Sequence, residues 1–135
     1  DEEYSKIVEI QSEIIPDGDI NIDGVWIGLS DRDEEGKWKF VDGDSSLCSC
    51  GDCDNLSQWE SGQPNEFGST GQDCAEVYGS TGIMNDNQCN KERKYICEYD
   101  IDGETVYIGF DDRKTWLQAG AACQNSISGQ LATFG

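Results

Sequence analysis

The residues of this chain that could do chemistry are mainly carboxylates and cysteines. Asp and Glu account for 28 of its 135 residues and Cys for 7, whereas His is absent. Without His the chain cannot form a His-ligated zinc site, a Ser-His-Asp triad or a Cys-His dyad. Carboxylates favour hard cations, which take oxygen ligands. Because nothing in the sequence marks one of these carboxylates as buried or as placed to activate a nucleophile, the sequence favours a binding protein over an enzyme.

Two acidic stretches match the first half of an EF-hand calcium loop. They are residues 31–36 (DRDEEG) and residues 19–24 (DINIDG). The twelfth position, where that loop closes with Glu, holds Asp42 in the first stretch and Ser30 in the second. Strand-like sequence flanks both stretches where the motif requires helices. We therefore do not interpret either stretch as an EF-hand.

The cysteines indicate an oxidising compartment and hence a secreted protein. They are Cys48, Cys50, Cys53, Cys74, Cys89, Cys97 and Cys123. Their number is odd, so at least one thiol is free or pairs outside the chain, which would allow self-association. The first three could hold a metal, but no good fourth ligand lies near them, and a disulfide-pinned loop is the simpler interpretation. The sequon at Asn55 predicts N-glycosylation of a surface loop.

The charge of the chain bears on its partners. Nine Lys and Arg against 28 Asp and Glu give a formal net charge of −19. This charge argues against binding to nucleic acid or to an anionic membrane, because both require clustered basic residues. The longest apolar runs fall well short of the ~20 residues that span a bilayer. With 36% hydrophobic residues, the chain can still build a core.

The residue pattern predicts one α+β domain over residues 1–135. We expect a helix over residues 1–15 and a second helix over residues 115–124, with Thr115 as its N-cap. Residues 42–71 lack periodicity and form one long irregular loop. The strands at residues 94–99 and 105–110 should pair as a hairpin. The other expected strands or apolar stretches are 25–29, 38–41, 74–78, 82–84 and 131–134.

Several short motifs resemble those of the C-type lectin-like domain. Residues 26–29 (WIGL) look like the core motif of that family, residues 63–65 (QPN) like its sugar motif, and residues 84–86 (MND) like its Trp-Asn-Asp motif. The resemblance implies an α+β lectin-like fold with disulfides Cys97–Cys123 and Cys74–Cys89. One pair and one odd thiol would remain among the other three cysteines.

The order of the segments differs from the family order. Residues 106–135 resemble the N-terminal part of the family, and residues 1–99 resemble the remainder. Two interpretations stay open. Either the domain is circularly permuted, or the sequence is one frame of a tandem array or filament.

The resemblance implies two calcium sites. In the family, the proline of the sugar motif is usually cis, which turns the flanking side-chain oxygens toward the ion. The residues at the sugar-binding calcium positions are Gln63, Asn65, Gln72, Asn85 and Asp86. The residues at the auxiliary positions are Asp31, Glu35, Glu66 and Asp73. Asp86 is the one carboxylate of the first set, since Gln72 stands where the family usually has Glu. We therefore expect weak calcium binding there.

The sugar itself stays open between galactose-like and mannose-like, because the QPN motif is a hybrid of the two family types. An aromatic at Phe67 favours galactose, since such rings stack on sugars. Trp38 and Trp59 are expected in the core. The first hypothesis is calcium-dependent glycan binding by a secreted domain through Gln63, Asn65, Phe67, Asn85 and Asp86. The alternative is a structural subunit of an extracellular filament or matrix, with calcium-stabilised loops and a degenerate sugar site.

Overall fold

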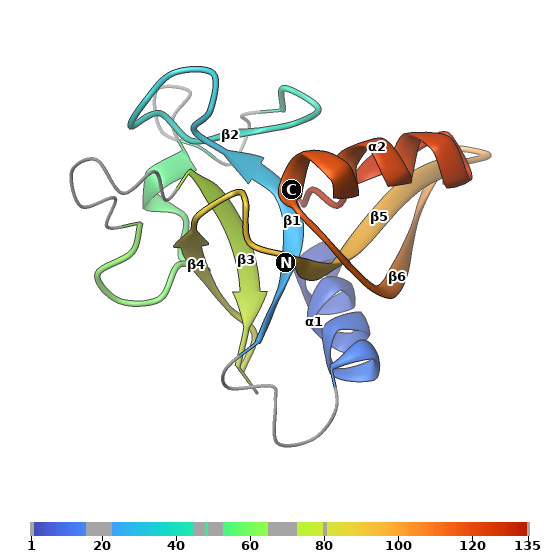
Figure 1. Ribbon diagram of the computed structural model, residues 1–135, viewed down its shortest axis with the longest axis horizontal. Coiled ribbons are helices and arrows are strands. Elements are labelled where there is room, and N and C mark those ends of the chain that lie inside the picture. Colours follow the sequence, from blue (N-terminus) through green and yellow to red (C-terminus); the bar gives the residue numbers. More distant parts are fainter. Residues whose placement is uncertain are drawn as a thin grey trace.

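The computed structural model describes residues 2–15, 23–44, 48, 53–64, 73–79 and 81–134. Within these residues the fold is α+β, as the sequence predicts, with two α-helices and one mixed sheet (Figure 1). The strands follow the order β4-β3-β1-β5-β6, while β2 pairs with β1 and β7 with β5. Their bounds are β1 Gly24–Ser30, β2 Lys39–Phe40, β3 Cys74–Tyr78, β4 Ile83–Asn87, β5 Arg93–Ile101, β6 Glu104–Lys114 and β7 Gln130–Leu131. The helices are α1 Glu2–Ile14 and α2 Trp116–Ile127, with a short 3-10 turn at Cys53–Asn55.

Strand β1 lies at the centre of the sheet and is buried on both faces. Val25 and Ile27 belong to one hydrophobic core, which includes α1. Trp26 points to the other core, where it packs with Trp116 of α2. A strand covered on both faces reads as a continuous apolar run, which explains the unbroken pattern of residues 25–29.

Helix α1 packs against β5 and β6 through one apolar face. Ile7 is fully buried there. Gly109 of β6 lets the helix approach closely, because a Cβ atom at that position would lie 2.6 Å from Cγ2 of Ile10. Gln11 on the same face is also fully buried, and its Nε2 donates a hydrogen bond to the Gly79 carbonyl at 3.2 Å. The sequence pattern did not predict a buried amide here.

Helix α2 begins at the cap that the sequence predicts. The Thr115 side chain accepts from the Gln118 backbone N–H, and the Gln118 side chain accepts from the Thr115 backbone N–H. The helix runs three residues beyond the predicted end, to Ile127, and Ser128 closes it in the left-handed conformation.

Three disulfides hold the described part of the chain together. Cys97–Cys123 joins β5 to α2, and Cys74–Cys89 joins the start of β3 to the turn after β4. These are the two pairs that the resemblance implies. The third disulfide is Cys48–Cys53. Cys50 lies outside the described residues, as does the side chain of Asn55.

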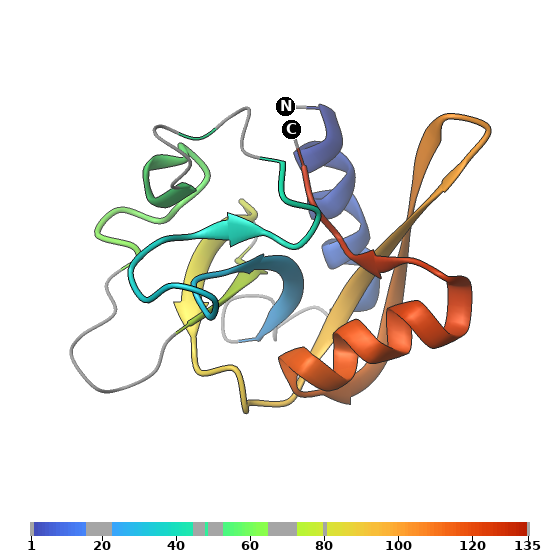
Figure 2. The same ribbon diagram turned by 90° about the horizontal axis from the view of Figure 1, so that it is seen from above.

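The last described residues lie against the start of the chain. The ring of Phe134 packs against Tyr4 at a centroid distance of 4.8 Å and against Phe40 at 5.0 Å. Ala132 bridges β5 and β1, since its N–H donates to Ile96 and its carbonyl accepts from Gly28. Figure 2 shows the start of α1 beside the last described residues. The permuted order of the segments stays a prediction.

Glu98 of β5 is a buried carboxyl beside this C-terminal segment. It is 8% exposed and accepts hydrogen bonds from the backbone N–H and the hydroxyl of Thr133. Burial raises its pKa, and the nearby Asp42 carboxylate acts in the same direction. The folded protein therefore holds this proton more tightly than the unfolded chain does. Its contribution to stability is present at low pH and is lost as the pH rises through the folded-state value.

We expect Glu98→Gln to remove this pH dependence. The amide oxygen of Gln can still accept from Thr133, and the side chain carries no charge to desolvate. Relative to wild-type protein, the variant should gain unfolding free energy between pH 4 and pH 7, measured by urea denaturation at both values. An equal difference between the two proteins at both pH values would contradict the prediction.

Candidate functional site

Three carboxylates meet where β1 ends and β3 begins. One oxygen from each of Asp31, Glu35 and Asp73 lies within 4.8 Å of the other two. The sheet brings these segments together, since β1 and β3 are antiparallel and the backbone N–H of Asp31 donates to the Asp73 carbonyl at 3.0 Å. Three of the four residues predicted for the auxiliary calcium site therefore form one cluster. The fourth, Glu66, lies outside the described residues.

The turn after β1 brings Glu35 close to Asp31. Oδ2 of Asp31 accepts a hydrogen bond from the Gly36 backbone N–H at 2.8 Å. Gly36 has a φ of 82°, a conformation that glycine adopts readily. Asp31 is 1% exposed and Glu35 is exposed, so the cluster extends from the protein interior to the surface.

The donor set of this cluster fits a hard divalent cation. Asp73 Oδ1 is buried, and the described part of the chain offers it no hydrogen-bond donor. Carboxylates this close repel one another, and a buried acceptor without a partner carries a desolvation penalty. A bound calcium ion would relieve both costs, because calcium takes carboxylate oxygens as ligands.

The predicted sugar-site residues are described only in part. Asn85 and Asp86 lie on β4, and Asp86 is 1% exposed. The Gln63–Pro64 peptide bond is cis, as is usual in the family that the sequence resembles. The backbone of Glu60 donates to the Met84 carbonyl at 2.9 Å, which lays the segment before this bond alongside β4. The remaining predicted residues lie outside the described part of the chain: Asn65, Phe67 and Gln72.

Sequence reasoning missed the polar group that contacts Asn85. Asn85 Nδ2 donates to Glu76 Oε2 at 3.2 Å, and Glu76 forms an ion pair with Arg93 at 3.1 Å. The available signal was a single acidic residue in a strand, Cys74–Tyr78, whose other members are apolar or aromatic. Trp38 and Trp59 lie in the core, as predicted, with ring centroids 5.0 Å apart.

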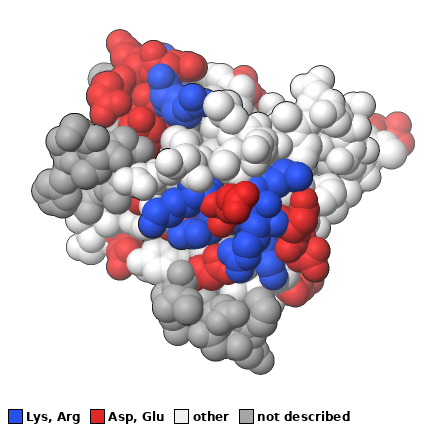
Figure 3. Space-filling view, viewed as in Figure 1, with Lys and Arg blue, Asp and Glu red and all other residues white. Residues whose placement is uncertain are grey.

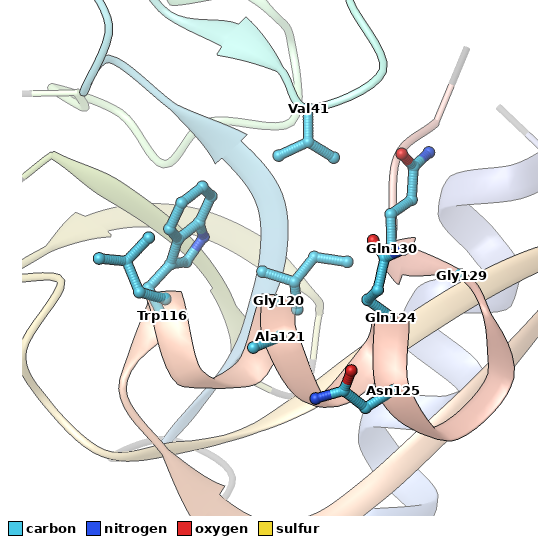
Figure 4. A pocket seen from close by; sticks show the side chains of 10 residues that line it. Val41, Trp116, Gly120, Ala121, Gln124, Asn125, Gly129 and Gln130 are labelled. Atoms are coloured by element: carbon cyan, nitrogen blue, oxygen red, sulfur yellow. The ribbon is translucent and has the colours of Figure 1, made fainter.

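A surface pocket of about 410 Å³ lies between α2, β7 and Val41 (Figure 4). Its lining includes Trp116, Gly120 and Leu131 and is mostly apolar. Of the predicted calcium and sugar residues that the structure describes, none lines it.

The charge is unevenly distributed over the surface. On the face seen in Figure 3, Lys and Arg gather in a central band with acidic side chains among and beside them. Partly buried ion pairs accompany this pattern, including Arg93–Asp23 and Arg113–Asp23.

Among the described helices, neither is long and apolar enough to cross a membrane.

Comparison with known proteins supports the resemblance. The chain is 45% identical over 76 residues to "C-type lectin domain family 4 member M" of Symphalangus syndactylus, covering 56% of this chain and 16% of that protein. It is 41% identical over 73 residues to "Hepatic lectin" of Gallus gallus, covering 54% and 31%. It is 40% identical over 73 residues to "CD209 antigen" of Papio hamadryas, covering 54% and 18%.

The chain spans less than a third of the length of each of these relatives. The family model described as the lectin C-type domain matches residues 3–99, which is well over half of the 135 residues. Together with the α+β fold and the disulfides at the implied positions, this match shows that the chain belongs to the C-type lectin domain family.

Proposed function

We propose that this domain is a binding module that recognises a glycan in a calcium-dependent way. The carboxylate cluster of Asp31, Glu35 and Asp73 is the observation that carries the proposal, because its geometry suits a cation. The names of the relatives, which include a hepatic lectin, support carbohydrate as the ligand class. Three disulfides support an extracellular location.

The sugar would bind at the edge formed by β4 and the Gln63–Pro64 segment. A calcium ion bound there would offer open coordination positions to two neighbouring sugar hydroxyls. Asp86 contributes the carboxylate charge, and the amide oxygens of Asn85 and Gln63 complete the described donors. Asn65, Phe67 and Gln72 are proposed to join them. Because amides dominate this set, we expect weaker affinity for calcium than at the carboxylate cluster.

The alternative function is a structural subunit of an extracellular filament or matrix. It is favoured by the same shortage of carboxylates at the sugar site, since Asp86 is the one acidic member of the predicted set. In that case the carboxylate cluster would bind calcium to stiffen the loops, and no sugar would bind.

Binding to immobilised galactose and mannose, with and without EDTA, tests the proposal. We expect retention that EDTA reverses and that Asp86→Asn weakens about tenfold or more, since affinity follows ligand charge. Asp102→Asn is the matched control. It removes the same charge at the exposed β5–β6 turn, where the φ of 52° suits Asn equally well. Retention on the sugar that EDTA leaves unchanged would contradict the proposal. Absence of retention, with melting temperature still falling in EDTA, would favour the structural alternative.

A further inference from the structure

Glu76 connects the proposed sugar site to an ionic network inside the sheet. It lies on β3 directly opposite Asn85 of β4, so the two side chains share one face of the sheet. Glu76 Oε2 accepts from Asn85 Nδ2 at 3.2 Å and from Asn87 Nδ2 at 2.9 Å. Glu76 Oε1 accepts from Arg93 Nε at 3.1 Å. Both oxygens of this carboxylate are therefore engaged.

The surroundings hold this carboxylate in place. The Glu76 side chain is 6% exposed. A Cβ atom on Gly24 would lie 2.4 Å from Glu76 Oε1, so the carboxylate fills the space that glycine leaves open. Arg93 is held in turn by Asp23, which Arg113 also contacts. Glu76 consequently presents Oε2 to Asn85 in a fixed position.

A fixed carboxylate determines which way the Asn85 amide faces. An amide can turn either its oxygen or its nitrogen toward a neighbour, but a carboxylate only accepts hydrogen bonds. Nδ2 must therefore face Glu76, and Oδ1 must face away from it. Cations bind the amide oxygen and not the amide nitrogen, so this is the orientation in which Asn85 can act as a calcium ligand.

We propose that Glu76 is a positioning residue that orients Asn85 Oδ1 toward the calcium ion of the sugar site. The proposal rests on the proposed function, which makes Asn85 a calcium ligand. It also concerns the sugar, because one N–H of the Asn85 amide is committed to Glu76. A single N–H is left to donate to a sugar hydroxyl.

Glu76→Gln tests this role with almost no change of shape. The variant side chain has one accepting oxygen, and the Arg93 guanidinium, which only donates, claims it. Its amide group then faces Asn85, whose oxygen should turn toward it and away from the calcium position. We expect calcium-dependent sugar binding to weaken about tenfold to a hundredfold, as is typical when a partner of a metal ligand is removed.

The matched control is Glu98→Gln, which neutralises a similarly buried carboxyl on β5 that contacts Thr133 instead of Asn85. It should bind calcium and sugar like wild-type protein. Near-ultraviolet circular dichroism and thermal unfolding establish that both variants are folded. Unchanged sugar affinity in folded Glu76→Gln would overturn the proposal while leaving the proposed function intact.

A double-mutant cycle separates positioning from general stabilisation. In an Asn85→Ala background the amide is absent, so Glu76→Gln should cause no further loss of calcium or sugar affinity. A residue that merely stabilised the sheet would weaken binding by the same factor in both backgrounds. Equal losses would therefore overturn the proposal.

The orientation of the Asn85 side-chain amide can be measured without calcium or sugar. In calcium-free wild-type protein, NMR should show a nuclear Overhauser contact between the side-chain amide protons of Asn85 and the γ protons of Glu76. Resonances missing in Asn85→Ala provide the assignment. We expect this contact to be lost in Glu76→Gln. If wild-type protein binds no sugar, the proposed function fails, and this measurement still decides whether Glu76 orients the amide. Absence of this nuclear Overhauser contact in wild-type protein would overturn the proposal that Glu76 orients Asn85.

Discussion

Asp73→Asn is expected to weaken calcium binding at least about tenfold and yet to stabilise the calcium-free protein. The loss follows from removing one of three carboxylates whose oxygens lie within 4.8 Å of one another. The higher stability of the calcium-free protein follows from the same geometry, because one of three mutually repelling charges disappears. The new amide can also donate to Asp31 or Glu35, which a carboxylate at this position cannot do.

Thermal unfolding in EDTA and in excess calcium measures both effects. Wild-type protein should show a large rise in melting temperature on adding calcium, because a ligand that binds only the folded state stabilises it. The melting temperature of Asp73→Asn should be higher than that of wild type in EDTA, and it should rise less when calcium is added. Asp33→Asn is the matched control, since it removes the same charge from an exposed position in the same turn. An Asp73→Asn protein that melts below wild type in EDTA would contradict the prediction.

Gly129→Ala is expected to destabilise the fold by about 3 kcal/mol. A Cβ atom at this position would lie 2.0 Å from the carbonyl oxygen of Glu98 and 3.0 Å from its carbon. Both atoms belong to the backbone of β5, which cannot turn aside as a side chain can. Either β5 or the connection from α2 to β7 must move, which disturbs the pairing of Glu98 with Gln130.

Gly120→Ala provides the comparison, because it adds the same methyl group within α2. Its Cβ atom would meet only Leu131 Cδ1, at 3.9 Å, which is ordinary van der Waals contact. Alanine is favoured over glycine inside a helix by about 0.5–1 kcal/mol, so this variant should be as stable as wild type or more stable. Urea denaturation measures both variants. Equal stabilities for the two would show that β5 yields to the added methyl group.

Local sequence pattern was sufficient for most of the secondary structure. The apolar run of residues 25–29 predicted the central strand, because a strand covered on both faces needs apolar residues throughout. Thr115 predicted the start of α2, because an N-cap acts on backbone groups within its own turn. The predicted ends of the helices and strands were less accurate. Strand β6 continues to Lys114, beyond the predicted end at residue 110, since its partner β5 extends the pairing to Arg93.

The sequence by itself determined the chemistry available to this protein: oxygen ligands, disulfides, no His, and motifs that place it in a lectin family. Only the tertiary structure decided which groups meet. The resemblance had grouped Asp31, Glu35 and Asp73 as candidate ligands, and the tertiary structure brings their oxygens together. It also buries Gln11 in the core. It also set Glu76 against Asn85. Gln11 and its partner Gly79 are 68 residues apart, and Glu76 and Asn85 lie on different strands. No local pattern encodes such contacts, because strand register and side-chain packing fix them together.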